Sequence, residues 1–300
     1  MNFIHKLRQT FRKSDKILAQ QQEIKLTLNK VLESIGRIEN RQLDTYTKSN
    51  ITDNEFRVFS QWGEDGIIQH LLRNIKVSRK IFVEFGVQNY IESNTRFLLI
   101  NNNWSGLVID GGSEEITYIK NDPIYWQYNL KAVNTFITKD NINQILSENG
   151  IQGEIGLLSV DIDGNDYWVW QAIDSVNPAI VVSEYNFRFG ASKAVTVPYD
   201  ADFVRTKAHY SNIYYGASLK ALCLLANRKD YAFVGCNSAG NNAFFVRNDL
   251  KPDSLRNLTS EEGYISAQFR ESRNEAGDLL YLSLEEEENI LNSLPLVDID

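Results

Sequence analysis

Two short apolar runs in the C-terminal half of the chain decide the fold. They are Tyr231–Gly235 (YAFVG) and Ala243–Arg247 (AFFVR), and only the residues Cys236–Asn242 (CNSAGNN) separate them. A parallel connection between strands needs a crossover of about a dozen residues or more, so this gap is too short for one. The two runs therefore predict neighbouring antiparallel strands.

Upstream of this hairpin, apolar runs alternate with stretches of helical periodicity. The runs are Ile81–Phe85, Gly106–Asp110, Leu130–Phe136, Ile155–Asp161 and Ala179–Glu184, and the helical stretches are Glu64–Asn74, Asn94–Asn101, Lys139–Glu148 and Ser218–Asn227. Such alternation predicts βαβ crossovers, and continuous apolar runs are typical of strands covered on both faces. We expect an α/β protein with a Rossmann-like, doubly wound, seven-stranded sheet, mostly parallel with an antiparallel hairpin at the end.

The N-terminal residues have a different pattern. Ile17, Ile24, Leu28, Val31, Ile35 and Ile38 repeat at a/d heptad spacing, interrupted at Gln21. This predicts a coiled-coil helix through which the chain forms a homo-oligomer; one amphipathic helix folded back on the globular domain is the alternative. Ahead of the seam, residues 1–16 form a basic amphipathic stretch that predicts weak contact with an anionic membrane surface, or only a frayed helix start.

These patterns divide the chain into four parts. We expect a basic amphipathic and coiled-coil helix over residues 1–43, a linker over 44–54, the α/β domain over 55–250, and an acidic, helical extension over 251–300.

Composition narrows the class of protein. The chain has 300 residues, 43% of them hydrophobic, and a net charge of −8, of which residues 1–16 carry +4. The remaining acidic excess gives no support for nucleic-acid binding. The two cysteines, Cys223 and Cys236, lack zinc-ligand spacing, no apolar run is long enough for a membrane span, and basic residues interrupt the N-terminus where a signal peptide would be apolar. We expect a cytoplasmic protein.

The first two strands end in residues suited to an adenosine cofactor. The first is followed by Gly86, Val87 and Gln88, and the second ends in Asp110 before Gly111. A glycine admits a cofactor close to the backbone, and an acid at the next strand tip can accept both ribose hydroxyls. No second or third glycine follows Gly86, which argues against a dinucleotide site, and turn formation alone is the alternative role for these residues.

The fourth and fifth strands end in carboxylates. Asp161 and Asp163 follow the fourth strand, and Glu184 and Asn186 the fifth. Adjacent parallel strands bring Asp161 and Glu184 together, and the repulsion between them is relieved by a divalent cation such as Mg²⁺ or Mn²⁺, or by a shared proton. We expect the metal ligands to be these four residues, although turn and capping roles would also account for Asp163 and Asn186.

Few residues could act as a general base. Among three histidines, only His209 follows the fifth strand, where it could take a proton, as could Asp163; a loop histidine without a role is the alternative. The sequence contains no nucleophile elbow and no phosphate-binding P-loop, so hydrolase and kinase chemistry is not expected.

Residues 55–248 resemble the FkbM-type and related class I methyltransferases that use S-adenosyl-L-methionine. The likeness is carried by Phe59–Gly66 (FSQWGEDG), the Glu84-Phe85-Gly86 tip, Ser93–Thr95, Trp104–Gly111, Asp161–Tyr167 (DIDGNDY), Glu184–Asn186, Tyr215–Leu219 and Asn237–Phe245. Five parallel strands followed by a hairpin are also the layout of that class. The resemblance implies that Glu84, Gly86 and Asp110 hold S-adenosyl-L-methionine and that the acceptor is a sugar or surface-glycan hydroxyl.

The full set of expected cofactor contacts is Glu84, Gly86, Gln88, Asn94, Asp110, Gly111 and Asp161. Gln88 and Tyr90 depart from the general glycine motif of methyltransferases. Two other functions stay open: a metal-dependent glycosyltransferase using Asp161-Ile162-Asp163, and a catalytically silent scaffold.

Overall fold

The computed structural model describes residues 2–43, 50–267 and 269–300, without the side chains of residues 2–4, 6–12 and 22. The chain divides into two units, Met1–Tyr46 and Thr47–Asp300, which we describe separately.

The second unit is built on a seven-stranded sheet with the order β3-β2-β1-β4-β5-β8-β7. Its strands are β1 (Ile81–Phe85), β2 (Ser105–Asp110), β3 (Leu130–Asn134), β4 (Gly153–Val160), β5 (Val176–Glu184), β7 (Tyr231–Cys236) and β8 (Asn242–Arg247). β8 lies between β5 and β7 and pairs antiparallel with both, whereas the pairs among β1 to β5 are parallel. The expected sheet and its closing hairpin are confirmed.

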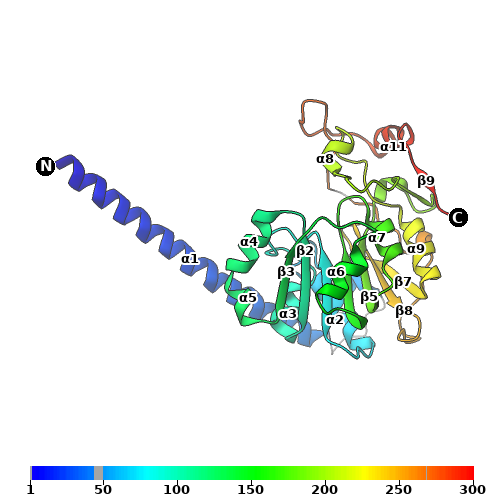
Figure 1. Cartoon of the computed structure of the whole chain (residues 1–300), viewed down its shortest axis with the longest axis horizontal. Helices are drawn as coiled ribbons and strands as arrows, with labels where there is room; N and C mark the ends of the chain where they lie inside the picture. The colour runs from blue at the N-terminus through cyan, green and yellow to red at the C-terminus, as the bar shows by residue number, and fades with distance from the viewer. Residues whose placement is uncertain (1, 44–49, 268) are drawn as a thin grey trace. The chain divides into compact units, whose positions relative to one another are not determined.

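Helices cover both faces of the sheet. One face carries α2 (Glu64–Asn74), α3 (Arg96–Asn102), α4 (Ser113–Asn121) and α5 (Pro123–Gln127), packed on residues such as Phe82, Val108 and Phe244. The other carries α6 (Ile142–Glu148), α7 (Asp166–Ala172) and α9 (Leu219–Arg228), packed on Val83, Leu158 and Phe245 (Figure 1). Successive strand residues alternate between these two cores, which explains the continuous apolar runs.

A smaller third core lies beyond the end of β5. It joins residues of the 187–217 segment to the C-terminal helix α11 (Leu284–Asn292), with Phe189, Val197 and Leu291 at its centre. The segment includes η2 (Phe187–Phe189), β6 (Val195–Thr196) and α8 (Arg205–Ala208), and β6 pairs with β9 (Val297–Asp298). The chain after β8 thus returns to the carboxyl end of the sheet.

The first unit contains one helix, α1 (Asn2–Gln42). Its a/d seam is open along its described part, since Ile17, Ile24, Leu28, Val31, Ile35 and Ile38 are each 48–58% exposed. The basic side chains Lys6, Arg8 and Arg12, on which the expected membrane contact depends, lie outside the described side chains. No described helix combines the length and apolarity that a membrane span requires.

Three expected boundaries need correction. Residues 44–49 of the expected linker lie outside the described residues, but Ile51–Asn54 forms the 3₁₀ helix η1, which joins the globular unit because Ile51 and Asn54 are buried. The third strand ends at Asn134 rather than Phe136. The extension over 251–300 is only partly helical: besides α11 it holds the short helix α10 (Ser260–Gly263) and β9, and its Glu287 is buried against Arg188 at 2.8 Å.

Candidate active site

Oxygen-bearing side chains from five adjacent strands lie on one face of the sheet at its carboxyl edge. They are Asp110 on β2, Glu84 on β1, Asp161 directly after β4, Glu184 on β5 and Asn242 on β8. Each of the five is separated in the sequence by two or four positions from a residue that packs beneath helices α2 to α5. Because strand side chains alternate between the two faces, all five are directed to that same face. The row spans the middle of the sheet and crosses from parallel to antiparallel strands.

In the loop after β1, three residues adopt the left-handed backbone conformation that glycine usually provides, although only one of them is a glycine. Gly86, Gln88 and Tyr90 have φ values of 66°, 46° and 61°, all left-handed. The Gln88 N–H donates to Asp110 Oδ2 at 2.7 Å, and Tyr90 is fully buried with its hydroxyl 2.9 Å from Thr95 Oγ1. Gln88 and Tyr90, which depart from the glycine motif of methyltransferases, therefore keep the turn, because their hydrogen bonds to Asp110 and Thr95 offset the cost of a left-handed conformation.

Asp110 lines a cavity of about 420 Å³. Its two oxygens accept the N–H groups of Gln88 and Gly112, each at 2.7 Å, which fixes the carboxylate. The cavity is lined by Gly86, Gln88, Ile109, Asp110, Gly111, Gly112, Thr135, Phe136, Ile137, Asp161, Ile162, Asp163, Asn165 and Phe203. An anchored carboxylate beside an apolar wall has the polarity that a nucleoside requires.

A second, smaller cavity of about 120 Å³ shares Gly86, Gln88 and Asp161 with the first. Glu84 and Asn94 line it. The Glu84 carboxylate accepts from Ser93 Oγ, Asn94 N, Thr95 N and Thr95 Oγ1, and burial raises its pKa. Glu84 therefore shapes the 93–95 turn, while Asn94 donates to Ser159 Oγ at 3.1 Å.

Asp161, Asp163 and Glu184 form a carboxylate cluster. Each offers an oxygen within 4.8 Å of the others. Burial and then the charges of Asp163 and Asp166 raise the pKa of Asp161, and burial followed by Asp161 and Asp163 does the same for Glu184. Oε2 of Glu184 is buried and has no hydrogen-bond partner among the described residues.

One cation already borders this cluster. Arg205 on α8 donates to Asp163 Oδ1 at 2.7 Å and to Glu271 Oε2 at 2.6 Å, and it stacks 3.6 Å from the centre of the Tyr215 ring. Arg205, in the 187–217 segment, thus links the loop after β4 to the C-terminal segment. Sequence spacing gave no signal for it, because it lies 42 residues from Asp163 in an irregular stretch.

Two predicted site residues do not join the cluster. The fully buried Asn186 donates to the carbonyls of Ile213 and Tyr215 and accepts from Arg188 N. Its amide therefore stabilises the 187–217 segment and is not free to bind a metal. His209 lines neither cavity. Its Nδ1 lies 2.6 Å from Ser211 Oγ, so the structure does not bring this histidine to the carboxylates.

Two buried residues of the site, Glu64 and Asn242, were not identified from the sequence. Glu64, at the start of α2, accepts from the side-chain amides of Asn237 and Asn242 at 2.7 and 2.9 Å, and Asn242 lines the smaller cavity. Both belong to stretches that carry the family resemblance, Phe59–Gly66 and Asn237–Phe245. The resemblance was the available signal, but it did not indicate that the two stretches meet.

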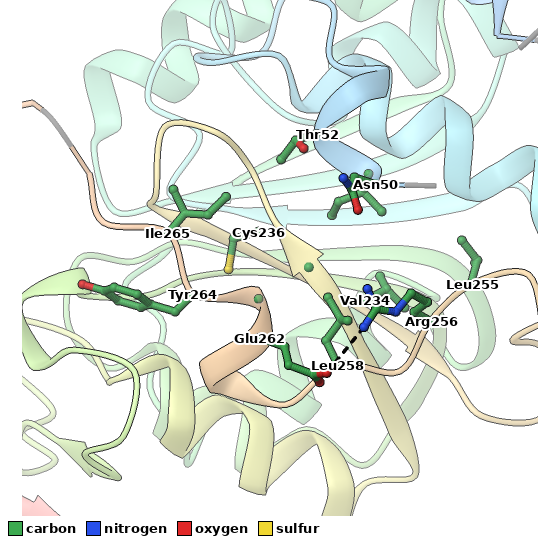
Figure 2. Close-up of a pocket in the computed structure, with 13 residues that line it drawn as sticks. Asn50, Thr52, Val234, Cys236, Leu255, Arg256, Leu258, Glu262, Tyr264 and Ile265 are labelled. Atoms are coloured by element: carbon green, nitrogen blue, oxygen red, sulfur yellow. Dashed lines mark hydrogen bonds and ion pairs between the residues drawn. The ribbon is translucent and has the colours of Figure 1, made fainter. Parts of the chain in front are cut away.

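A third cavity, of about 220 Å³, lies along the edge strand β7 (Figure 2). Val234, Cys236, Leu258 and Ile265 line it, and the Arg256–Glu262 ion pair, 3.4 Å apart, borders it. None of the predicted site residues lines this cavity.

Comparisons with known proteins give structural neighbours only. No protein-family model matches the chain, and no curated protein matches its sequence. The N-terminal domain of EvdMO1 with S-adenosylhomocysteine bound is 11% identical, with a TM-score of 0.41 over 71% of this chain and 94% of that one. An S-adenosylmethionine-dependent methyltransferase from Clostridium acetobutylicum ATCC 824 is 11% identical, with a TM-score of 0.39 over 62% of this chain and 90% of that one. A putative caffeoyl-CoA O-methyltransferase from Staphylococcus aureus is 13% identical, with a TM-score of 0.39 over 74% of this chain and 99% of that one.

Proposed function

We propose that the protein is an S-adenosyl-L-methionine-dependent O-methyltransferase that acts on a sugar or surface-glycan hydroxyl. The observation that carries the proposal is the anchored Asp110 carboxylate beside a cavity that continues past Gly86 to Asp161. A nucleoside bound there places its ribose hydroxyls on Asp110 and its other end toward the carboxylate cluster. The acceptor class rests on the resemblance to FkbM-type methyltransferases.

The cluster supports a role for a divalent cation. Its ligand atoms are oxygens only, a set that Mg²⁺ and Mn²⁺ prefer, and Glu184 Oε2 is a buried oxygen without a partner among the described residues. We propose that Asp161 and Glu184 hold the ion, with Asp163 beside them. A cation at this position supplies a lowered pKa for the acceptor hydroxyl.

The proton must leave the acceptor hydroxyl as the methyl group transfers. Asp163 is the group that we propose for this task, because its side chain is 58% exposed and its Oδ1 is oriented by Arg205. An oriented carboxylate next to the acceptor removes the proton without a large rearrangement.

Calorimetry with S-adenosylhomocysteine tests the cofactor assignment. We expect binding to the full chain, and Asp110→Ala should weaken it about tenfold or more, since a hydrogen bond to a charged group contributes about 1.5–3 kcal/mol. Asp253→Asn, an exposed aspartate outside both cavities, is the control. A UDP-sugar titrated in parallel separates this function from a glycosyltransferase, and binding of neither ligand would favour a silent scaffold.

We also propose that α1 self-associates. With Leu28 and Ile35 at a positions and Ile24, Val31 and Ile38 at d positions, β-branched residues occupy the layers where a parallel dimer prefers leucine. This pattern favours more than two strands. Residues 1–16 contribute basic charge that would attract the helix end to an anionic membrane surface.

A further inference from the structure

One buried oxygen beside the smaller cavity has no hydrogen-bond partner among the described residues. Asn242 is 4% exposed and lines that cavity, and its Oδ1 accepts no hydrogen bond from any described residue. A buried amide oxygen left unpaired costs about 1–3 kcal/mol, so native structures rarely retain one without a purpose.

The orientation of this amide is fixed by its neighbour. Asn242 Nδ2 donates to Glu64 Oε1 at 2.9 Å. Oε1 of Glu64 also accepts from Asn237 Nδ2, and Oε2 accepts from the Trp62 N–H. Both oxygens therefore act as acceptors, and a flipped Asn242 amide would set two oxygens against each other. Oδ1 of Asn242 must therefore point away from Glu64.

Glu64 is itself held in place. It accepts from Asn237 Nδ2 at 2.7 Å and, through Oε2, from the Trp62 N–H at 2.8 Å. Oδ1 of Asn237 accepts the N–H groups of Gly240, Asn241 and Asn242 at 3.0–3.2 Å, which fixes the Asn237 amide in turn. The hairpin turn and the start of α2 thus form one rigid support for the Asn242 oxygen.

The cavity beside Asn242 is rich in hydrogen-bond acceptors. Asp161 and Asn242 line it on the β4 and β8 side, and Glu84 and Glu92 line it on the side of β1 and the 86–94 loop. Glu84 already accepts from the 93–95 turn, and Glu92 accepts from Arg57 at 2.9 Å. An ammonium group matches this lining, because it donates hydrogen bonds in several directions.

We propose that Asn242, oriented by Glu64, binds the α-ammonium group of the methionine end of S-adenosyl-L-methionine. The assignment rests on the proposed function, since Gly86, Gln88 and Asp161 line both the smaller cavity and the larger one. Asn242 is a binding residue here, and Glu64 is a positioning residue.

Two ligands with the same nucleoside test this assignment. S-adenosylhomocysteine carries the amino-acid end, whereas 5′-methylthioadenosine has the same adenosine and thioether without it. Calorimetry on the full chain should show that Asn242→Ala weakens S-adenosylhomocysteine about tenfold or more and leaves 5′-methylthioadenosine unchanged, because only the first ligand has the ammonium. Asn248→Ala, an exposed amide just after β8 that does not line the cavity, should change neither affinity.

A second variant covers the case in which Asn242→Ala does not fold. In Glu64→Gln, the new amide can accept from the NH₂ group of Asn242 or donate to its oxygen, so Asn242 is no longer held in one orientation. We therefore expect the same selective loss of S-adenosylhomocysteine affinity, with a smaller magnitude. Equal loss of both ligands in a variant with an unchanged melting temperature would overturn the assignment, as would unchanged S-adenosylhomocysteine affinity.

Two further outcomes distinguish failure of the ammonium assignment from failure of the proposed function. A selective loss seen with Mg²⁺ but absent in EDTA would overturn the ammonium assignment and make Asn242 part of a metal site. Failure of the unmodified chain to bind either ligand would instead contradict the proposed function itself.

Discussion

The backbone carbonyl of Asp161 closes directly over Gly86. A Cβ built on Gly86 would stand 1.9 Å from the Asp161 oxygen, and Gly86 also has a left-handed φ of 66°. This close approach brings the loops after β1 and β4 together, and both residues line each of the two cavities.

Gly86→Ala should therefore reduce stability and cofactor binding by more than the strain of a left-handed alanine would cause. We expect a lower melting temperature and at least tenfold weaker S-adenosylhomocysteine binding, because the Asp161 loop must move. Gly150→Ala is the matched control: its φ is 77°, but nothing lies within 4 Å of the added Cβ, so it should lose only about 1–2 kcal/mol of stability and no affinity. Equal behaviour of the two variants would contradict the close-packing argument.

The buried Asp65 should make stability depend on pH. Its Oδ2 accepts the N–H groups of Val58, Phe59 and Ser60, but burial outweighs these bonds and raises its pKa to about 6 from an ordinary 3.8. The folded state then holds a proton that the unfolded state has lost, so stability falls as pH rises from about 4 to 6, by roughly 3 kcal/mol for this group.

Asp65→Asn should remove that contribution, since an amide does not titrate and its oxygen can still accept the same N–H groups. Melting temperatures measured from pH 4 to pH 7 should fall less steeply for the variant than for the unmodified chain. The exposed Asp253→Asn should keep the original slope. An unchanged slope in Asp65→Asn would mean that the Asp65 carboxyl is already ionised at pH 4.

The carboxylate cluster should bind Mn²⁺. We expect a bound-ion signal by electron paramagnetic resonance, weakened at least tenfold in Asp161→Asn and in Glu184→Gln because each removes a charged oxygen ligand. Glu148→Gln, an exposed glutamate on α6, is the control. If the two carboxylates share a proton instead, Mn²⁺ will not bind and EDTA will leave methyl transfer unchanged.

The exposed seam of α1 should hold copies of the chain together. Light scattering of the full chain should give a mass above that of a dimer, and Val31→Asn should lower it by placing a polar group in a d layer. Leu26→Asn, 61% exposed and on the opposite side of the helix from the seam, should have no effect. Equal masses for all three proteins, at the value of a monomer, would exclude self-association through α1.

Local pattern was enough to predict the sheet. Apolar runs such as Ile81–Phe85 are buried on both faces, and the short gap between Tyr231–Gly235 and Ala243–Arg247 leaves no room for a crossover, so composition and spacing constrain strand type and direction. The same reasoning located Gly86, Asp110, Asp161 and Glu184, because strand order alone brings the carboxyl ends of neighbouring parallel strands to one edge.

Only the tertiary structure decided which side chains are free to act there. Asn186 and Asn242 are both amides at the ends of neighbouring strands. The Asn186 amide donates to the carbonyls of Ile213 and Tyr215, whereas the Asn242 amide donates to Glu64, its oxygen has no partner among the described residues, and Asn242 lines the smaller cavity. Arg205 contacts Asp163 from the four-residue helix α8, which is too short for its sequence periodicity to predict. Hydrogen bonds between residues far apart in the chain depend on packing in three dimensions, and local sequence patterns carry no record of them.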